Sequence, residues 1–235
     1  MSENTTTHEF SGSRRKFLDQ VRHALGHSSQ GDPPPPSQPP VRTERLIRQV
    51  SSSDPRRVDR WIAMAKKNGM KVQRASAVGL ASAVDTFLTG TEVKSIMLNF
   101  SDLPENSLRS HLVAKGYAVR LWGEENCSRN VFESDAALTD CRYGLADTGS
   151  LLVWSDSGFG RSTTLTVPLH IVLLPAARIV ADMIDALPRV RRDTAGLMPS
   201  NVVIINGPSK TADIEMNLVT GVHGPKFLYV IVIDD

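Results

Sequence analysis

Cysteine is scarce in this chain, which has only Cys127 and Cys141 among its 235 residues. Their spacing matches no Cys-x-x-Cys arrangement, so neither a disulfide framework nor a zinc site is indicated. Iron–sulfur clusters are usually held by about four cysteine thiolates, which this chain cannot supply by itself. We therefore expect that the chain binds no metal and no cofactor of its own, and that any such cluster lies on a partner.

Long hydrophobic runs are also missing. No stretch approaches the roughly 20 apolar residues that span a bilayer, and the first residues, MSENTTTHEF, lack the features of a secretory signal. The chain is 40% hydrophobic and 22% charged, as is usual for a soluble globular protein. We expect a cytoplasmic protein with no transmembrane segment.

The net charge of +2 conceals an uneven distribution. Residues 1–74 contain 14 Lys and Arg against 7 Asp and Glu, which leaves 13 against 18 for the remainder. A basic segment can attract acidic proteins, nucleic acid or anionic lipid, although a solvated basic face is the simpler interpretation. No helix-turn-helix, zinc-finger or RNA-recognition signature accompanies the charge, so we expect no nucleic-acid binding.

The chain divides into three predicted parts. Residues 1–26 contain an amphipathic basic helix, with Phe17, Leu18, Val21 and Leu25 at helical spacing and Gly26 at its end. Residues 27–41 are rich in proline, which favours an extended, semi-rigid linker. Residues 42–235 are expected to form one domain. We expect the helix and linker to serve docking and not chemistry.

Helix and strand patterns alternate in the body of the chain. Asp54-Pro55 is typical of the start of a helix that ends at Asn68-Gly69. Further helices are expected near residues 77–88, 107–115 and 179–187. The expected strands are residues 70–74, 95–100, 117–122, 150–154, 169–174, 201–205 and 227–233. This alternation predicts an α/β sandwich with a mixed sheet.

A glycine turn follows the apolar run Val202–Ile205. The run stops at Asn206-Gly207-Pro208, and Ser209-Lys210-Thr211 predicts the start of a helix that ends at Gly221. Free backbone N–H groups, the hydroxyl groups and Lys210 would hold a carboxylate or phosphate there, and helix capping is the alternative. The segment lacks the glycine spacing of a nucleotide-hydrolysing phosphate loop.

Other candidates border strands or lie in turns. Arg161 is able to grip a carboxylate, although an exposed turn arginine is the favoured interpretation. His170 is expected to be buried and hydrogen-bonded, or to face a pocket, and the first is favoured. His223 is the candidate for proton transfer. The predicted ligand-binding residues are Thr148, Gly149, Arg161, His170, Gly207, Ser209, Lys210, Thr211, Asp213, His223 and Gly224. We predict that these glycine turns converge into one anion pocket at one end of the sheet.

Several motifs resemble one protein family. The segments ADTGSLLVWSDSGFGRSTTL, VPLHIVLLPAARIV and INGPSKTADIEMNLVTGVHGPKFLYVIVIDD resemble the LutC/YkgG family, whose proteins contain the LUD (lactate utilisation) domain. The resemblance is dense over residues 142–235 and weaker over residues 61–122, and the family's first helix resembles RRKFLDQVRHALG. The chain departs from the family at Asn206, often serine in relatives, and at Tyr229, often histidine.

The resemblance implies a three-layer α/β/α sandwich similar to the NagB/RpiA/CoA-transferase group. It also implies an accessory role in oxidising L-lactate to pyruvate, alongside partner subunits that carry iron–sulfur clusters. A free-standing transferase or isomerase acting on a phosphorylated or CoA-linked substrate is the alternative, and it rests on fold analogy and on the expected anion site at the turn Gly207–Thr211. The resemblance transfers no catalytic residues to this chain. The question of whether the chain is an enzyme or a non-catalytic subunit therefore stays open.

Overall fold

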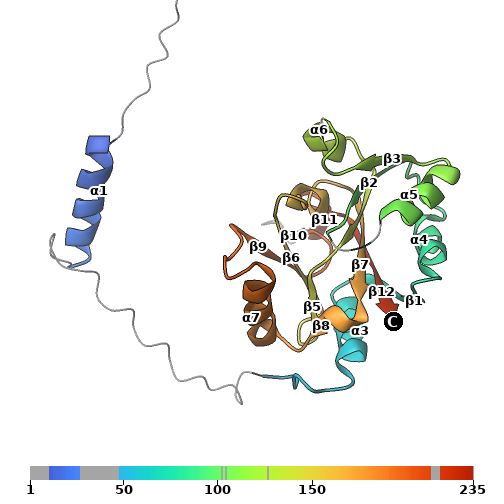
Figure 1. Ribbon diagram of the computed structural model, residues 1–235, viewed down its shortest axis with the longest axis horizontal. Helices are drawn as coiled ribbons and strands as arrows, with labels where there is room; N and C mark the ends of the chain where they lie inside the picture. Colours follow the sequence, from blue (N-terminus) through green and yellow to red (C-terminus); the bar gives the residue numbers. More distant parts are fainter. Residues whose placement is uncertain are drawn as a thin grey trace, which may run out of the picture. The chain divides into compact units, whose positions relative to one another are not determined.

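The computed structural model describes residues 11–26, 48–101, 103, 105–125, 127–212 and 218–234 (Figure 1). The chain divides into two units, Met1–Ile47 and Arg48–Asp235. In the first unit, the predicted amphipathic helix is confirmed as α1, Ser11–Ala24, and Gly26 follows it with a φ of +77°. The predicted linker and the predicted domain boundary near residue 41 lie outside the described residues.

The second unit is built on a parallel sheet of six strands in the order β1-β12-β7-β4-β2-β3. The bounds are Lys71–Ser76 for β1, Phe227–Asp234 for β12, Leu169–Pro175 for β7, Ala136–Asp140 for β4, Ser95–Asn99 for β2 and Ala118–Leu121 for β3. The inner strands β4, β7 and β12 are buried along nearly their whole length. Strands covered on both faces need nearly continuous apolar runs, which explains the sequences LHIVLLP and FLYVIVID.

Helices cover one face of this sheet. α4, Leu80–Leu88, and α5, Glu105–Ala114, pack on a core that includes Leu138, Ile171 and Ile231 (Figure 1). The opposite face carries α3, Arg57–Lys67, together with a second, four-stranded sheet. The predicted α/β fold with helices on both faces is therefore confirmed, and the large sheet itself is wholly parallel.

The second sheet has the order β8-β5-β6-β9 and contains the mixed pairing. Its strands are Ile179–Val180 (β8), Tyr143–Leu145 (β5), Ser150–Trp154 (β6) and Val202–Ile205 (β9). α7, Met183–Asp193, packs on it through Ala186 and Val190. α6, Cys127–Phe132, lies between β3 and β4 in the chain. Among the described residues, no helix has the length and apolarity to cross a membrane.

Trp61 joins α3 to both sheets. Its side chain is fully buried, and its Nε1–H donates a hydrogen bond of 3.0 Å to the carbonyl of Ser150. Gly144 on β5 lies directly beside it, because a Cβ there would be 2.9 Å from Trp61 Nε1 and from Leu174 Cδ2. Only glycine allows this close approach of the two sheets.

Two helices begin later than predicted. α3 starts at Arg57, because the Asp54 carboxylate accepts a hydrogen bond of 2.8 Å from the N–H of Arg56 and holds a turn there. The segment predicted as a helix over 179–187 begins with β8, and α7 starts only at Met183. Asp182 caps α7 by accepting from the N–H of Asp185 at 3.0 Å.

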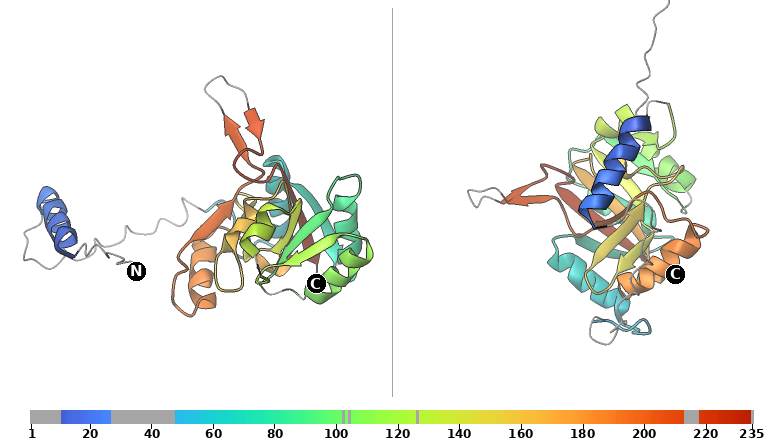
Figure 2. Two further views of the ribbon diagram at one scale, coloured as in Figure 1. Left: turned by 90° about the horizontal axis from the view of Figure 1, so that it is seen from above. Right: turned by 90° about the vertical axis from the view of Figure 1, so that its left-hand side faces the viewer.

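The predicted helix after Pro208 is wrong. This segment forms an antiparallel hairpin of β10, Lys210–Ala212, and β11, Leu218–Thr220, which projects from the body (Figure 2). β-Branched Thr and Val residues favour strands, and a hydrogen bond of 3.0 Å from the N–H of Gly221 to the Ser209 carbonyl closes the base of the hairpin. The helix dipole invoked for anion binding is therefore absent at this position, and Asp213 lies outside the described residues.

Candidate functional site

Thr148, Gly149 and Gly207 gather around the end of α3. Asn68 Nδ2 donates to the Thr148 carbonyl at 2.7 Å and to Asn206 Oδ1 at 2.5 Å. Gly149 has a φ of +70°, and a Cβ there would be 2.4 Å from the backbone N of Ala65. Two of the predicted glycine turns therefore do meet, and their glycines allow α3 to pack closely against both.

Ser209 and Gly224 form a second group at the base of the hairpin. The N–H of Ser209 donates to the carbonyl of Pro225 at 2.9 Å, and a Cβ on Gly224 would be 3.2 Å from Ser209 Cβ. The backbone donor that was expected to hold an anion is thus already engaged within the protein. His223 and Lys210 are exposed beside this turn, and Thr211 is half-buried on β10.

Arg161 is exposed at the start of a short 3-10 helix, Arg161–Thr164. No hydrogen bond or ion pair among the described residues joins Arg161, Lys210 and His223 to one another. The predicted site residues therefore form two packed clusters with separate exposed side chains, and their role in ligand binding stays a prediction.

His170 is buried and hydrogen-bonded, as the favoured interpretation had it. Its side chain is 1% exposed, and Nε2 lies 2.9 Å from Thr139 Oγ1. Nδ1 is buried without a partner among the described residues. Burial lowers the pKa of His170 to about 3, so the ring is neutral at physiological pH.

The strand order of the large sheet reverses between β2 and β4. The chain passes from β2 to β3 on one side and from β4 to β7 on the other. In α/β sheets, ligands commonly bind outside the carboxyl ends of the strands near such a reversal. By this rule, a ligand site is expected near the carboxyl ends of β2 and β4.

Buried polar residues end both of these strands. Asn99 at the end of β2 donates through Nδ2 to the Gly160 carbonyl at 3.0 Å and to Thr163 Oγ1 at 2.8 Å. Asp140 at the end of β4 accepts from the N–H of Ser101 at 2.9 and 3.1 Å. The reversal point itself is thus filled by the chain's own loop. Neither Asn99 nor Asp140 was predicted as a site residue, although a polar residue at the end of an apolar strand was an available signal.

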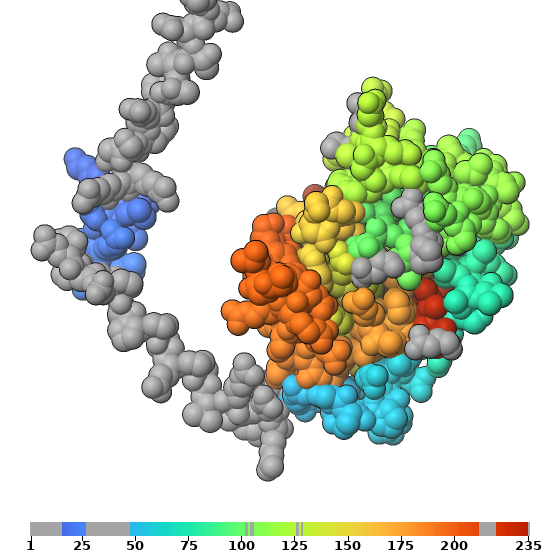
Figure 3. Space-filling model, in the orientation of Figure 1, coloured from blue at the N-terminus to red at the C-terminus, as the bar shows by residue number. Residues whose placement is uncertain are grey.

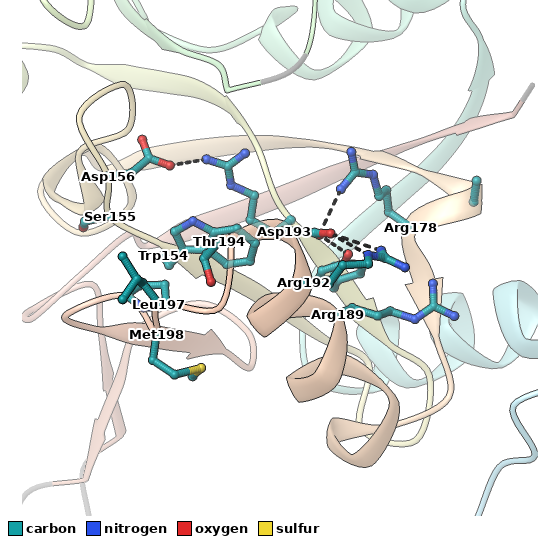
Figure 4. A pocket seen from close by; sticks show the side chains of 14 residues that line it. Trp154, Ser155, Asp156, Arg178, Arg189, Arg192, Asp193, Thr194, Leu197 and Met198 are labelled. Atoms are coloured by element: carbon teal, nitrogen blue, oxygen red, sulfur yellow. Dashed lines mark hydrogen bonds and ion pairs between the residues drawn. The ribbon is translucent and has the colours of Figure 1, made fainter.

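A pocket of about 790 Å³ lies beside this edge. It is built by the segments that leave the carboxyl ends of β4 and β7, by the end of β6 and by the end of α7 with the residues that follow it (Figures 3 and 4). Its lining residues are Arg142, Tyr143, Trp154, Ser155, Asp156, Ala177, Arg178, Arg189, Arg192, Asp193, Thr194, Leu197, Met198 and Pro199.

Asp193 organises one side of the pocket. Its carboxylate accepts a short hydrogen bond from the Tyr143 hydroxyl and hydrogen bonds of 3.1 Å from Nε and Nη2 of Arg192, while Arg178 Nη1 lies 4.0 Å away. Burial acts to raise the pKa of Asp193, but the hydrogen bonds from Tyr143 and Arg192 outweigh it and hold the pKa below its usual value. Burial, together with Asp193, raises the pKa of Tyr143. Asp193 is therefore ionised and Tyr143 neutral near pH 7.

Arg142 is held on the other side. Its guanidinium forms an ion pair of 2.6 Å with Asp156 and lies over the Trp154 ring, 4.7 Å from the ring centroid. Its side chain is only 11% exposed. Ion pairing and stacking on an aromatic ring together fix a guanidinium in one orientation.

None of the residues that line this pocket was a sequence candidate. β4 was not predicted, because its sequence AALTD is short and contains two alanines. The position of Arg142 after the end of a strand was therefore not recognisable from the predicted elements. Arg178 lies four residues after the predicted strand 169–174. Its place close behind the end of a strand was a usable signal for a site residue.

The described residues contain neither a metal site nor a nucleophilic thiol at Cys141. No group of three or more His, Cys, Asp or Glu is placed to hold a metal ion among them. Cys141 is a buried free thiol, and burial together with Asp140 raises its pKa well above the usual value. A thiol in such surroundings stays protonated and is a poor nucleophile.

The LUD domain model matches residues 58–233, and the chain belongs to this family. It is 38% identical over 238 residues to lactate utilization protein C of Shouchella clausii, with 94% of this chain and 98% of that protein covered. It is 28% identical to lactate utilization protein C of Halalkalibacterium halodurans, with the same coverage. The fold is similar to the crystal structure of a DUF162 family protein from Deinococcus radiodurans, with a TM-score of 0.57 and 19% identity over 75% of this chain and 96% of that one.

Proposed function

We propose that this protein acts in lactate utilisation, as an accessory subunit of a complex that oxidises L-lactate to pyruvate. One observation carries the proposal, namely the similarity to proteins named lactate utilization protein C over nearly the full length of both chains. Iron–sulfur clusters on partner subunits would carry the electrons. The small number of cysteines supports this division of labour, because two thiols do not form the usual ligand set of a cluster.

We further propose that the subunit binds a small anionic ligand. The pocket beside β4 and β7 supports this part, because its lining includes more arginine than carboxylate side chains. Guanidinium groups match carboxylate and phosphate oxygens in both charge and geometry.

A free-standing transferase or isomerase now has less support. That alternative relied partly on an anion site at a helix start near Ser209, and the segment forms a strand instead. The exposed His223 also lies outside the pocket described above.

Deletion of the gene tests the proposed role. In a strain with no other lactate dehydrogenase, loss of the protein should abolish growth on L-lactate as the sole carbon source and leave growth on pyruvate unchanged. Restoring the full chain should restore growth, and affinity purification should recover partners that contain iron–sulfur clusters. Unimpaired growth of the deletion strain on L-lactate contradicts the proposal.

A further inference from the structure

We propose that β9 is a self-complementary interface, at which two copies of this chain join their second sheets edge to edge in antiparallel orientation. The partner at this surface is a second copy of the same chain. The inference goes beyond the proposed role in lactate utilisation and does not depend on it.

β9 is an outer strand of the second sheet. In the strand order β8-β5-β6-β9 its neighbour is β6 (Figure 1). Among the described residues, the backbone of Val202–Ile205 forms no hydrogen bond with any segment other than β6. A strand with one neighbour directs the remaining backbone N–H and C=O groups away from the sheet. These groups of β9 are therefore available to a further strand.

The other outer strands of the two larger sheets are protected. β1 contains Lys71 and Arg74, and β3 contains Arg120, and charged side chains on an edge oppose pairing with another strand. β8 has two residues, and both are buried. β9 has the sequence VVII, without charge or proline, and Ile204 is 47% exposed. An uncharged apolar edge of this kind favours pairing with another chain.

The absence of charge favours a second copy as the partner. No Asp, Glu, Lys or Arg occurs between Thr194 and Ser209, a stretch that includes β9. In an interface with twofold symmetry, residues near the axis meet the same surface of the other copy, so charges there would repel each other. An acidic or basic partner would gain no ion pair along this stretch. A second copy meets no repulsion.

The pleat of β9 is compatible with this pairing. Val203 and Ile205 pack on the core between the two sheets, whereas Val202 packs on the opposite side with Trp154. Side chains alternate along a strand, so Ile204 lies on the same side as Val202. Antiparallel pairing centred on Val203 or on Ile204 brings matching faces of the two copies together. In both registers the two Ile204 side chains are opposite or diagonal neighbours on one face.

Further apolar side chains lie in the segment that leads into β9. Leu197 is 78% exposed and Met198 is 48% exposed, and Figure 4 shows both beside Trp154. In an antiparallel pair, this segment runs toward the residues that follow β9 in the other copy. Pairing therefore covers apolar surface as well as backbone groups. Because four-residue strands make a small interface, we expect a dissociation constant on the order of 10 µM.

Sedimentation velocity of the purified full chain tests the inference over roughly 1 to 200 µM protein. The sedimentation coefficient should increase with concentration from the monomer value to the dimer value. Ile204→Lys should weaken association at least about tenfold, because it places two like charges close together on the paired edge. Ile204→Thr, which is uncharged and β-branched, should keep most of the association.

A matched charge elsewhere controls for a general effect of lysine. Val78 is 96% exposed in the turn before α4, so Val78→Lys adds the same charge outside the second sheet and should associate as the wild type does. Circular dichroism establishes that the variants are folded.

Mixing two variants tests the symmetry of the interface. Ile204→Glu alone should be as weakly associated as Ile204→Lys. An equal mixture of the two should form dimers again, because opposite charges then meet across the paired edge. Such a rescue requires that the two Ile204 positions lie close together.

Three results would overturn the inference. The wild-type chain might stay monomeric over the whole range, which leaves β9 to a different protein. Ile204→Lys might associate as strongly as the wild type, which places the contact elsewhere, such as on α1. The mixture of the lysine and glutamate variants might stay monomeric. Growth of the deletion strain on L-lactate tests the proposed function separately, and neither result decides the other.

Discussion

His170 contributes a pH-dependent term to the stability of the fold. Its pKa is lowered from 6.5 to about 3 by burial, so between these values the unfolded chain binds a proton that the folded chain does not. Stability therefore falls as the pH is lowered through 6.5. From pH 7 to pH 4.5 the loss due to this residue should be about 2 to 3 kcal/mol.

Urea unfolding at a series of pH values measures this loss. His170→Gln should lower stability at pH 7 but flatten the pH dependence, because glutamine does not titrate. His223→Gln, at an exposed histidine, is the matched control and should keep the wild-type profile. If His170→Gln retains the full wild-type slope between pH 4.5 and 7, the buried ring is not its source.

Gly149 and Gly90 offer a second test at the scale of single residues. Both have positive φ angles, +70° and +76°, but a Cβ on Gly149 would be 2.4 Å from the Ala65 backbone N, while a Cβ on Gly90 has no atom within 4 Å. Gly90→Ala should cost about 1 kcal/mol of stability from backbone strain alone. Gly149→Ala should cost about 3 kcal/mol or more, because α3 must also move.

Urea unfolding of both alanine variants provides the comparison. Equal losses for the two would show that α3 does not pack against the Gly149 turn as described. The glycine was expected from sequence to approach a ligand. The structure shows instead that it approaches another part of the protein.

At the scale of elements, patterns that repeat within one segment were predicted well. α3, β1, β2, β6, β7, β9 and β12 all lie within a few residues of their predicted ranges. The hairpin β10–β11 was missed for a physical reason. Its two strands pair with each other, and the N–H of Gly221 donates a hydrogen bond back to the Ser209 carbonyl. A local helical pattern contains no information about such a partner.

The helix α1 leads to a prediction about partner binding. Its apolar residues Phe17, Leu18 and Val21 are exposed, and the helix also contains several basic residues. A chain that begins at Val41 keeps both sheets and should unfold with a free energy within about 0.5 kcal/mol of the full chain. It should nevertheless recover less of the iron–sulfur partners in affinity purification.

A full-length double variant, Phe17→Glu with Val21→Glu, serves as the matched comparison for this shortened chain. It keeps the length and the linker but makes the apolar face of α1 acidic, and it should lose partners to a similar degree. Undiminished recovery of partners by both proteins would show that α1 is not a docking element.

At the scale of the whole molecule, the position of the pocket depends on how the two sheets are joined. The chain leaves the large sheet at the end of β4, forms β5 and β6 of the second sheet, and returns to the large sheet as β7. Arg142 and Arg178 follow the carboxyl ends of the neighbouring strands β4 and β7. Arg189 and Arg192 lie on α7, which packs on the second sheet. The site thus belongs to the junction of two layers and to no single motif.

The sequence alone determined the fold class, the family and the scarcity of cluster ligands, because these depend on periodicity, motif order and composition. It also indicated that His170 would be buried, since an isolated histidine in VPLHIVLL has apolar neighbours on both sides. Only the tertiary structure decided where charge collects. Arg142, Arg178, Arg189 and Arg192 are up to 50 residues apart in the chain, and their proximity arises from strand order and from the turn after α7. Side chains brought together by long-range packing leave no local pattern in a sequence, whereas the apolar alternation of a strand does.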